Sequence, residues 1–316
     1  MDEAVLTLSD KRTKQLADLI SISHESHMEL NTVADWEKGA DRRVRPKRLD
    51  HSWVYGTSHW DAMNQDQRME MLWLENAHLA SGFVWLEEGL PPLFIRILHE
   101  HWERMPQQIY DYMMIFSKEE IVHTQMFRKY LDIAGLPLFR APEALGIMHG
   151  GDDTLVKMHP VAGVLCTYLI ELAAEQTAMC QAEAGIDPLS QKIFFEHHRE
   201  EARHLAFGKW ICEAALESFT PEAKQNLGYM VRALMSTMIP RFTYNEEINQ
   251  YLSFDIGICD SEELDRVHRS ENNKRLSRER HGAMLDWIKK LGIAPADYDW
   301  FDPIVPPPPQ AFERYA

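Results

Sequence analysis

Long helix-forming segments occur in two consecutive pairs along this chain, and only a few turn-forming residues separate the members of each pair. The first pair covers residues 64–104 and 107–134 on either side of Pro106, and the second covers 161–184 and 190–218 on either side of a Gly-Ile-Asp-Pro turn. Short turns make consecutive helices antiparallel neighbours, and two such hairpins that bury their apolar faces together form a four-helix bundle. The arrangement therefore predicts an all-α fold with a bundle core.

The segments outside the two hairpins predict further helices around the same core. We expect an N-terminal helix at 9–22, an irregular stretch at 31–65 and two or three helices within 221–292. A chain of 316 residues that is 45% hydrophobic can bury one large core. We therefore expect a single helical domain over residues 1–316, with the bundle core at about 64–218.

Prolines and glycines mark where the helical pattern is expected to bend or stop. Pro91-Pro92 predict a possible bend in the first long helix. Residues 135–160 hold four glycines and three prolines and predict a loop. The run from Pro306 to Pro309 predicts an extended tail.

The charge and apolar runs of the chain argue against two classes of partner, nucleic acids and membranes. The net charge of -16 repels phosphate backbones, so we expect no nucleic acid partner. The one basic run, residues 42–48, is interpreted as a solvated linker that pairs with the chain's own acids. The longest apolar run, near 161–170, is too short to span a bilayer, and the acidic N-terminus shows no signal peptide. We expect no membrane partner.

The cysteines indicate the compartment. Four are present, and none shows CxxC spacing. Three lie in helical apolar patterns and are interpreted as small core residues. Reduced thiols fit a cytoplasmic protein, which is the expected localisation.

Two Glu-x-x-His motifs carry the chemistry. They are Glu120 with His123 and Glu201 with His204. Residues three apart share a helix face, so both side chains of a motif can reach one ion. A third match, Glu75-Asn76-Ala77-His78, is interpreted as a surface pair, because such motifs also arise by chance.

The second hairpin offers a partner for its motif at equal depth. Glu201 lies about fourteen residues after the turn centred near Ile186, and Glu171 lies about fifteen before it. Glu175 is one turn nearer the loop, so Glu171 matches the depth better. The second hairpin therefore predicts Glu171 opposite Glu201.

The first hairpin offers two candidates. Glu120 lies about fourteen residues after Pro106, and counting back as far past this turn leads to Glu87 or Glu88. Glu88 shares its face with Ser81 and the prolines. Glu87 shares a helix face with apolar residues and is favoured; these are Ala80, Phe83, Leu90 and Phe94.

His197 adds a third potential ligand to the last helix of the bundle. It precedes Glu201 by four residues and His204 by seven, so the three side chains fall on one helix face. The alternative is an ordinary, partly buried histidine.

This ligand set indicates a buried pair of metal ions. Carboxylates and imidazoles suit iron or manganese, and no thiolate set for structural zinc is present. Four glutamates would cancel the charge of two divalent cations, which makes the site tolerable inside a bundle. A reduced di-iron pair with an open position can bind dioxygen, which makes O2 the expected co-substrate.

With these residues in place, the chain resembles the p-aminobenzoate N-oxygenase (AurF-like) family of di-iron oxygenases, which have a ferritin-like bundle. The resemblance runs from about Asp66 to Trp210, and the extra histidine is its specific element. It is carried by Asp66-Gln67-Arg68, Glu87, Glu120 with His123, Glu171, Asp187-Pro188, and His197 with Glu201 and His204.

The resemblance implies an activity and its partners. It implies oxygenation of an amine, of the arylamine type, to a hydroxylamine or nitro group through a peroxo di-ferric species. It also implies an external electron donor, either a protein or a reductant, and often a homodimer. The implied metal ligands are Glu87, Glu120, His123, Glu171, His197, Glu201 and His204.

One departure bears on the substrate. Family members that act on aminobenzoates need a cation for the substrate carboxylate, yet this chain has no Lys or Arg from Met69 to Leu86. We predict an apolar, aromatic pocket for a small-molecule substrate, in which aminobenzoate is a poor substrate compared with a larger or less anionic aromatic or amine compound, and N- and C-oxygenation both stay open. The pocket residues expected are Phe83, Trp85, Tyr112 and Tyr168.

Two alternatives remain open. One is another di-iron enzyme, such as an acyl desaturase or a different oxidase or hydroxylase. The other is a non-enzymatic, iron-binding helical protein.

Overall fold

The computed structural model describes residues 6–141, 154–157, 160–179, 185–238 and 244–299. Over these ranges the chain is helical and contains no strand. The predicted all-α fold is confirmed. None of the helices in the described ranges combines the length and apolarity that crossing a bilayer requires.

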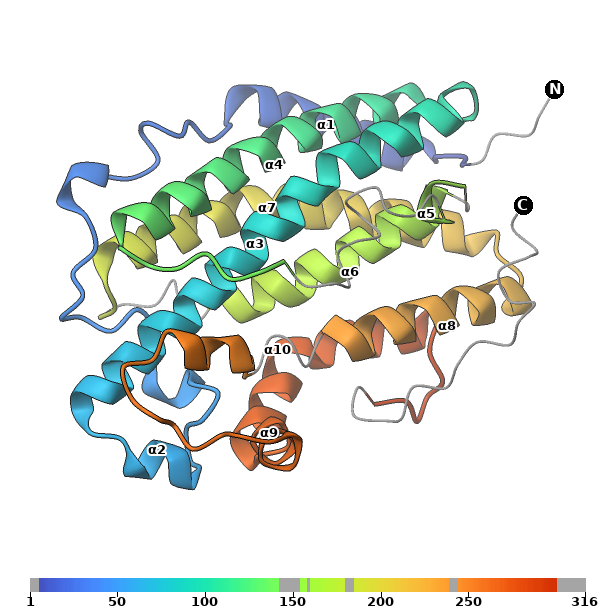
Figure 1. The fold of residues 1–316 in the computed structure, drawn as a ribbon. Helices are drawn as coiled ribbons and strands as arrows, with labels where there is room; N and C mark the ends of the chain where they lie inside the picture. Colours follow the sequence, from blue (N-terminus) through green and yellow to red (C-terminus); the bar gives the residue numbers. More distant parts are fainter. Residues whose placement is uncertain (1–5, 142–153, 158–159, 180–184, 239–243, 300–316) are drawn as a thin grey trace.

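Four long antiparallel helices form the core (Figure 1). One hairpin consists of α3 (Gln65–His101) and α4 (Gln107–Ile133), and the other of α6 (Pro160–Ala178) and α7 (Pro188–Glu217). Helix α3 also packs on α6, and α4 packs on α7. Every pair of neighbouring helices around the bundle is therefore in contact.

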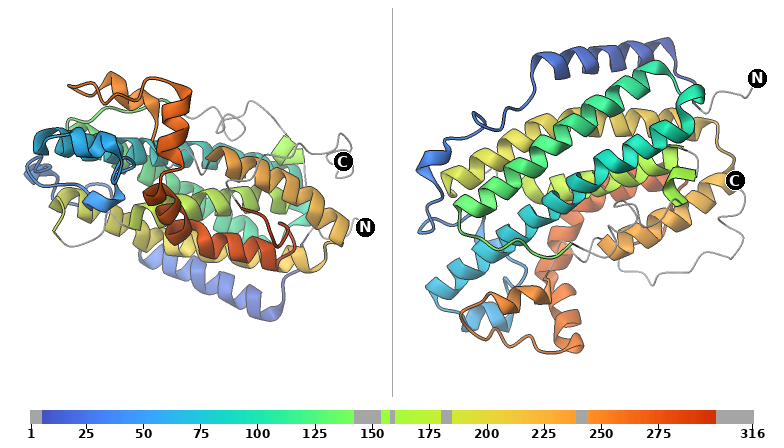
Figure 2. Two further views of the ribbon diagram at one scale, coloured as in Figure 1. Left: turned by 90° about the horizontal axis from the view of Figure 1, so that it is seen from below. Right: turned by 45° about the horizontal axis from the view of Figure 1, so that its top comes forward.

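Additional helices cover the bundle on both sides (Figures 1 and 2). Helix α1 (Asp10–Glu25) packs on α4 and α7. On the opposite side, α8 (Pro221–Met238) and α10 (Glu271–Lys290) pack on α6, and α9 (Ser261–His268) packs on α10. Helix α6 packs on the bundle helices α3 and α7 and also on α8 and α10, which explains why it is apolar around most of its circumference.

Short elements fill the connections. They are η1 (Trp36–Lys38), η2 (Leu49–His51), α2 (Ser58–Ala62), η3 (Trp102–Arg104), α5 (Thr154–Lys157) and η7 (Glu246–Gln250).

Local sequence signals set the starts of two bundle helices. Asn64 caps α3 in a capping box with Gln67, in which each side chain bonds to the other residue's backbone N–H. Asp187 caps α7 by accepting from the Ser190 N–H, and Pro188 occupies the first turn. Asp187 also accepts from the backbone N–H of Asp41, which anchors the N-terminal segment to the start of α7.

The expected boundaries hold with a few differences. Helix α1 continues to Glu25, three residues beyond the predicted end. Helix α3 continues through Pro91 and Pro92, as the predicted segment 64–104 requires, but ends at His101, three residues before the predicted end. Within the predicted loop at 135–160, the described residues 154–157 form the one-turn helix α5, and the expected tail at Pro306–Pro309 lies outside the described residues.

The basic run at 42–48 is not a fully solvated linker, which corrects one expectation. It does pair with acids: Arg43 with Asp41, and Lys47 with Glu75. Lys47, however, is only 3% exposed. The segment packs against the bundle, so this lysine is part of the interior.

The cysteine expectation holds for two residues. Cys166 and Cys212 are buried, whereas Cys259 is exposed. Cys180 lies outside the described residues.

Candidate metal centre

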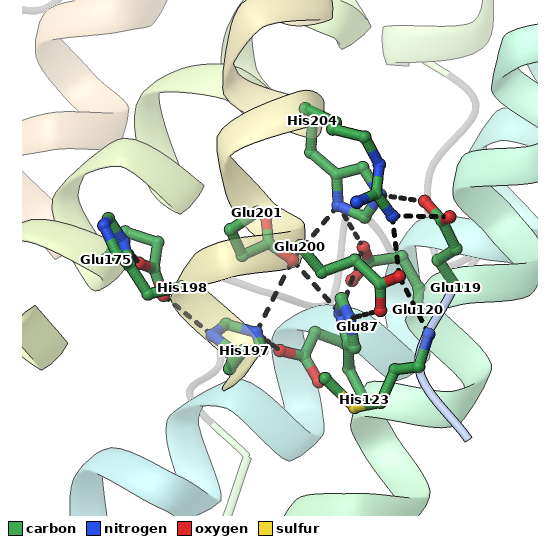
Figure 3. Close-up of polar contacts among 12 residues, drawn as sticks. Glu87, Glu119, Glu120, His123, Glu175, His197, His198, Glu200, Glu201 and His204 are labelled. Atoms are coloured by element: carbon green, nitrogen blue, oxygen red, sulfur yellow. Dashed lines mark hydrogen bonds and ion pairs between the residues drawn. The ribbon is translucent and has the colours of Figure 1, made fainter. Parts of the chain in front are cut away.

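All seven predicted ligands are buried inside the bundle, and none is more than 4% exposed. Figure 3 shows the side chains of six of them converging from three helices. Helix α3 supplies Glu87, α4 supplies Glu120 and His123, α6 supplies Glu171, and α7 supplies His197, Glu201 and His204.

One group of four could hold an ion. Potential ligand atoms of Glu120, His123, Glu201 and His204 all lie within 4.8 Å of one another. The Nδ1 atom of His204 is 2.9 Å from Glu120 and 3.0 Å from Glu201. The Nδ1 atom of His123 is 3.1 Å from Glu201. Both Glu-x-x-His motifs therefore meet, as their matched depth predicted.

A second group overlaps the first. Potential ligand atoms of Glu87, His123 and His197 also lie within 4.8 Å of one another. The Nε2 atom of His197 is 2.8 Å from Glu87 and 3.5 Å from Glu201. The two groups lie side by side and share His123, which is compatible with two neighbouring ions.

The structure distinguishes between the glutamates that were alternative candidates for the ligand positions. Glu88 is exposed and pairs with Arg128 on the outside of the hairpin. Glu171 is 4% exposed and lies near Glu201 and Glu120, outside both groups of four and three. Glu175 is also buried, but its carboxylate lies on the far side of His197.

The third Glu-x-x-His match is not a surface pair, which is a correction. Glu75 is fully buried and accepts bonds from the Ser52 hydroxyl and the Trp53 backbone N–H, besides its ion pair with Lys47. His78 is half-buried and bonds to Asn245. The expectation failed because a segment distant in the sequence covers this face of α3.

The electrostatics of the cluster favour positive charge. Burial acts to lower the pKa of His197, but Glu87 and Glu175 outweigh it and raise the pKa to about 10. Burial likewise opposes protonation of His204, and Glu201 and Glu120 again hold its pKa well above the usual range. Burial raises the pKa of Glu87 to about 8, against the influence of His197. The cluster of side chains therefore attracts cations, protons included.

Several buried polar atoms in the cluster make no hydrogen bond of good geometry, although Glu120 and His123 have ionisable neighbours close by. A buried atom without a partner is costly, since it has lost its bonds to water. A bound cation would satisfy these oxygens and this nitrogen at once, so the residues fit a metal pair. The atoms are Glu87 Oε2, both carboxylate oxygens of Glu120, His123 Nδ1, Glu171 Oε1 and Glu201 Oε2.

Carboxylates also hold the outer nitrogens of two histidines, which the sequence reasoning missed. His123 Nε2 lies 2.9 Å from Glu200, and His204 Nε2 lies 2.7 Å from Glu119. Both nitrogens face away from the cluster, so each imidazole can donate outward while Nδ1 faces inward. The signal was the doubled glutamate in each motif, at 119–120 and 200–201.

Arg203 connects these two outer carboxylates. Its guanidinium bonds to Glu119 at 2.8 Å and to Glu200 at 2.6 Å, and also to the Ser23 hydroxyl of α1. The backbone N–H of Met28 donates to Glu200 as well. The segment that contains α1 is thus tied to the supports of the cluster.

The four predicted pocket residues point in different directions. Phe83 lies against His197, with ring centroids 4.6 Å apart, and Tyr112 packs on Phe116, which stacks on His204. Trp85 instead donates to the carbonyl of Phe139, and Tyr168 packs on Trp287. Only Phe83 and Tyr112 are thereby placed near the cluster.

A family model supplies independent support. The model for p-aminobenzoate N-oxygenase AurF matches residues 9–292 of the chain. The chain belongs to this family. No curated protein and no solved structure matches it. Membership in the AurF family confirms the ferritin-like helical fold and extends the resemblance from the bundle to α1 and α10.

Proposed function

We propose that this chain is an oxygenase that binds two iron ions, or manganese, and uses dioxygen to oxygenate an amine of the arylamine type to a hydroxylamine or nitro product. AurF is an oxygenase family. The observation that carries the proposal is the pair of overlapping ligand groups that share His123 inside the bundle. All seven predicted ligands belong to the proposed site.

The ions, when bound, would supply the activation of dioxygen and the oxidising power. The chain's own residues do the rest. Glu87, Glu120, Glu171 and Glu201 would balance the charge of two divalent cations, so that the loaded site is neutral in a dry interior. His123 and His204 present Nδ1 toward the ions and are held from behind by carboxylates.

Aromatic rings shield this cluster from water. Phe83 stacks on Phe127 with centroids 4.8 Å apart, and both rings pack on His197. The ring of Phe116 stacks on the imidazole of His204, with ring centroids 3.7 Å apart. These rings exclude solvent that would otherwise compete with an organic substrate and quench reactive oxygen species.

The surroundings favour a substrate without a carboxylate. Residues 69–86 contain no Lys or Arg, and Phe83 of this stretch lies beside His197. Arg203 is near the cluster, but two carboxylates already occupy its guanidinium. We propose a larger or less anionic aromatic amine than p-aminobenzoate, an external electron donor, a homodimer and a cytoplasmic location.

The test is reconstitution followed by isotope tracing. Metal-free protein is loaded anaerobically with Fe(II), its metal content is measured, and it is exposed to 18O2 with a panel of aromatic amines and a reductant. We expect about two irons per chain and 18O on the amine nitrogen, with p-aminobenzoate among the poorest substrates.

Other outcomes would point to the alternatives. 18O on carbon would indicate a hydroxylase, and a new double bond in an acyl substrate would indicate a desaturase. Bound iron without turnover of any substrate would favour a non-enzymatic iron-binding protein. Efficient turnover of p-aminobenzoate would contradict the proposed substrate class.

A further inference from the structure

Glu175 is a buried acid that the proposed ligand set does not use. It lies on α6, one turn after Glu171, and is only 1% exposed. Its Oε1 atom is 2.7 Å from Nδ1 of His197, and its Oε2 atom is 2.6 Å from Nδ1 of His198. Both carboxylate oxygens are therefore engaged by imidazoles, one buried and one half-exposed.

The contact with Glu175 separates the two nitrogens of His197. Nδ1 faces Glu175, while Nε2 faces the cluster, 2.8 Å from Glu87 and 3.5 Å from Glu201. A neutral imidazole carries one N–H, and the nitrogen without it offers the lone pair that binds a metal. A carboxylate that accepts the Nδ1–H leaves the lone pair on Nε2.

The support of His197 differs from that of the other two histidines. Glu119 and Glu200 hold Nε2 of His204 and His123, and Arg203 joins these two carboxylates. Glu175 instead holds Nδ1 and has a histidine as its second partner. The third imidazole is thus turned the opposite way and is supported separately.

We propose that Glu175 is the positioning residue that holds His197 with Nε2 toward the metal pair, so that the site combines one Nε2 ligand with two Nδ1 ligands. This rests on the metal site of the proposed function. Carboxylates that hold a ligating histidine typically contribute about 10–100-fold to metal affinity.

Cobalt-loaded protein provides a test that needs no turnover. Co(II) shifts the proton resonances of metal-bound imidazoles, and their remaining N–H protons exchange with water. We expect the wild-type protein to show three such exchangeable signals, one for each histidine. In Glu175→Ala we expect one of the three to disappear through fast exchange, and Co(II) affinity to fall about 10–100-fold.

Two further variants sharpen the test. Glu175→Gln keeps an oxygen that can accept from Nδ1, so we expect three signals, with only the His197 resonance shifted and a smaller loss of affinity. Glu196→Ala is the matched control, because Glu196 is a buried glutamate on α7 that pairs with Lys192 and Arg199 instead of the cluster. We expect it to keep all three signals in place.

The outcomes are distinguishable. Three unshifted signals and unchanged affinity in Glu175→Ala would overturn the role of Glu175 while leaving the metal site intact. If Glu175→Ala does not fold, Glu175→Gln decides, and three unshifted signals there would overturn it equally. Failure of the wild-type protein to bind Co(II) would overturn both the metal site and this inference.

Discussion

The Nε2 atom of His197 lies 2.8 Å from Oε1 of Glu87, although the two residues are 110 positions apart in the chain. His197 belongs to α7 and Glu87 to α3, so the contact joins the two helical hairpins inside the bundle. Both residues are 1% exposed. Burying these two polar groups costs desolvation free energy, and a cation bound by the ligand groups around them would offset that cost.

Metal content gives the most direct prediction. Glu120→Ala should remove one or both of two bound ions per chain, because both carboxylate oxygens of Glu120 face the cluster without a hydrogen-bond partner. The loss of thermal stability should be smaller than that of a zinc finger losing its metal, since the bundle has its own apolar core. Metal analysis and thermal denaturation measure both effects.

Glu88→Ala is the matched control for Glu120→Ala. Glu88 follows Glu87 directly, is exposed and pairs with Arg128. We expect full metal content in this variant. Full metal content in Glu120→Ala as well would remove Glu120 from the ligand set.

The stability of the metal-free protein should depend on pH through Glu171. Burial raises the pKa of Glu171 well above its usual value of 4.5, and repulsion from Glu201 and Glu120 adds to this. The folded state therefore binds a proton that the unfolded chain releases above about pH 4.5, so the contribution of Glu171 to stability falls as pH rises. Metal-free Glu171→Gln should then be more stable than metal-free wild type at neutral pH, because glutamine has no such proton to lose.

Urea denaturation in the presence of a chelator measures this effect. The advantage of Glu171→Gln should shrink as the pH falls toward 4, where the wild-type carboxyl is protonated in both states. An advantage independent of pH would show that packing, and not ionisation, causes it.

Two helical glycines should respond in opposite ways to substitution by alanine. A Cβ atom at Gly208 of α7 would lie 2.8 Å from Cβ of Tyr168 on α6, and neither atom can rotate away. Gly208→Ala should therefore destabilise the protein by about 1–3 kcal/mol through overpacking. At Gly82 of α3 a Cβ atom meets nothing within 4 Å, so Gly82→Ala should stabilise it by about 0.5–1 kcal/mol.

Chemical denaturation of both glycine variants tests the close approach of α6 and α7. Equal effects of the two substitutions would contradict it. Because Glu171 and His204 lie on these same helices, Gly208→Ala should also weaken metal binding, and Gly82→Ala should not.

The bundle could be predicted because its signals are local. Helical periodicity and the number of residues between each glutamate and the turn were enough to predict that Glu171 and Glu201 lie opposite each other. No knowledge of the tertiary structure was needed. The same counting selected Glu87 over Glu88, since the neighbours on each helix face differ in polarity. These features depend only on residues within a few turns of one another.

The parts that could not be predicted depend on distant segments. Glu75 was expected at the surface, because nothing in α3 reveals that Lys47 and Ser52 cover it. The supporting role of Glu175 was missed for a related reason: its partners lie on α7. Trp85 was expected in the substrate pocket, but a carbonyl at Phe139 engages its ring N–H elsewhere.

The ion pair of Lys47 and Glu75 gives the last prediction. Their side chains are 4% and 0% exposed, so removing one partner leaves the other charge buried without its counterion. Lys47→Met should therefore destabilise the protein by about 3–5 kcal/mol. Glu75→Gln should also be destabilising, although its oxygen can still accept from Ser52 and Trp53.

In the double variant no uncompensated charge remains, so its loss of stability should be clearly smaller than the sum of the two single losses. Urea denaturation of the four proteins completes the cycle. Additive losses would mean that the two charges act independently, and that the segment around Lys47 is held on α3 by its other contacts alone.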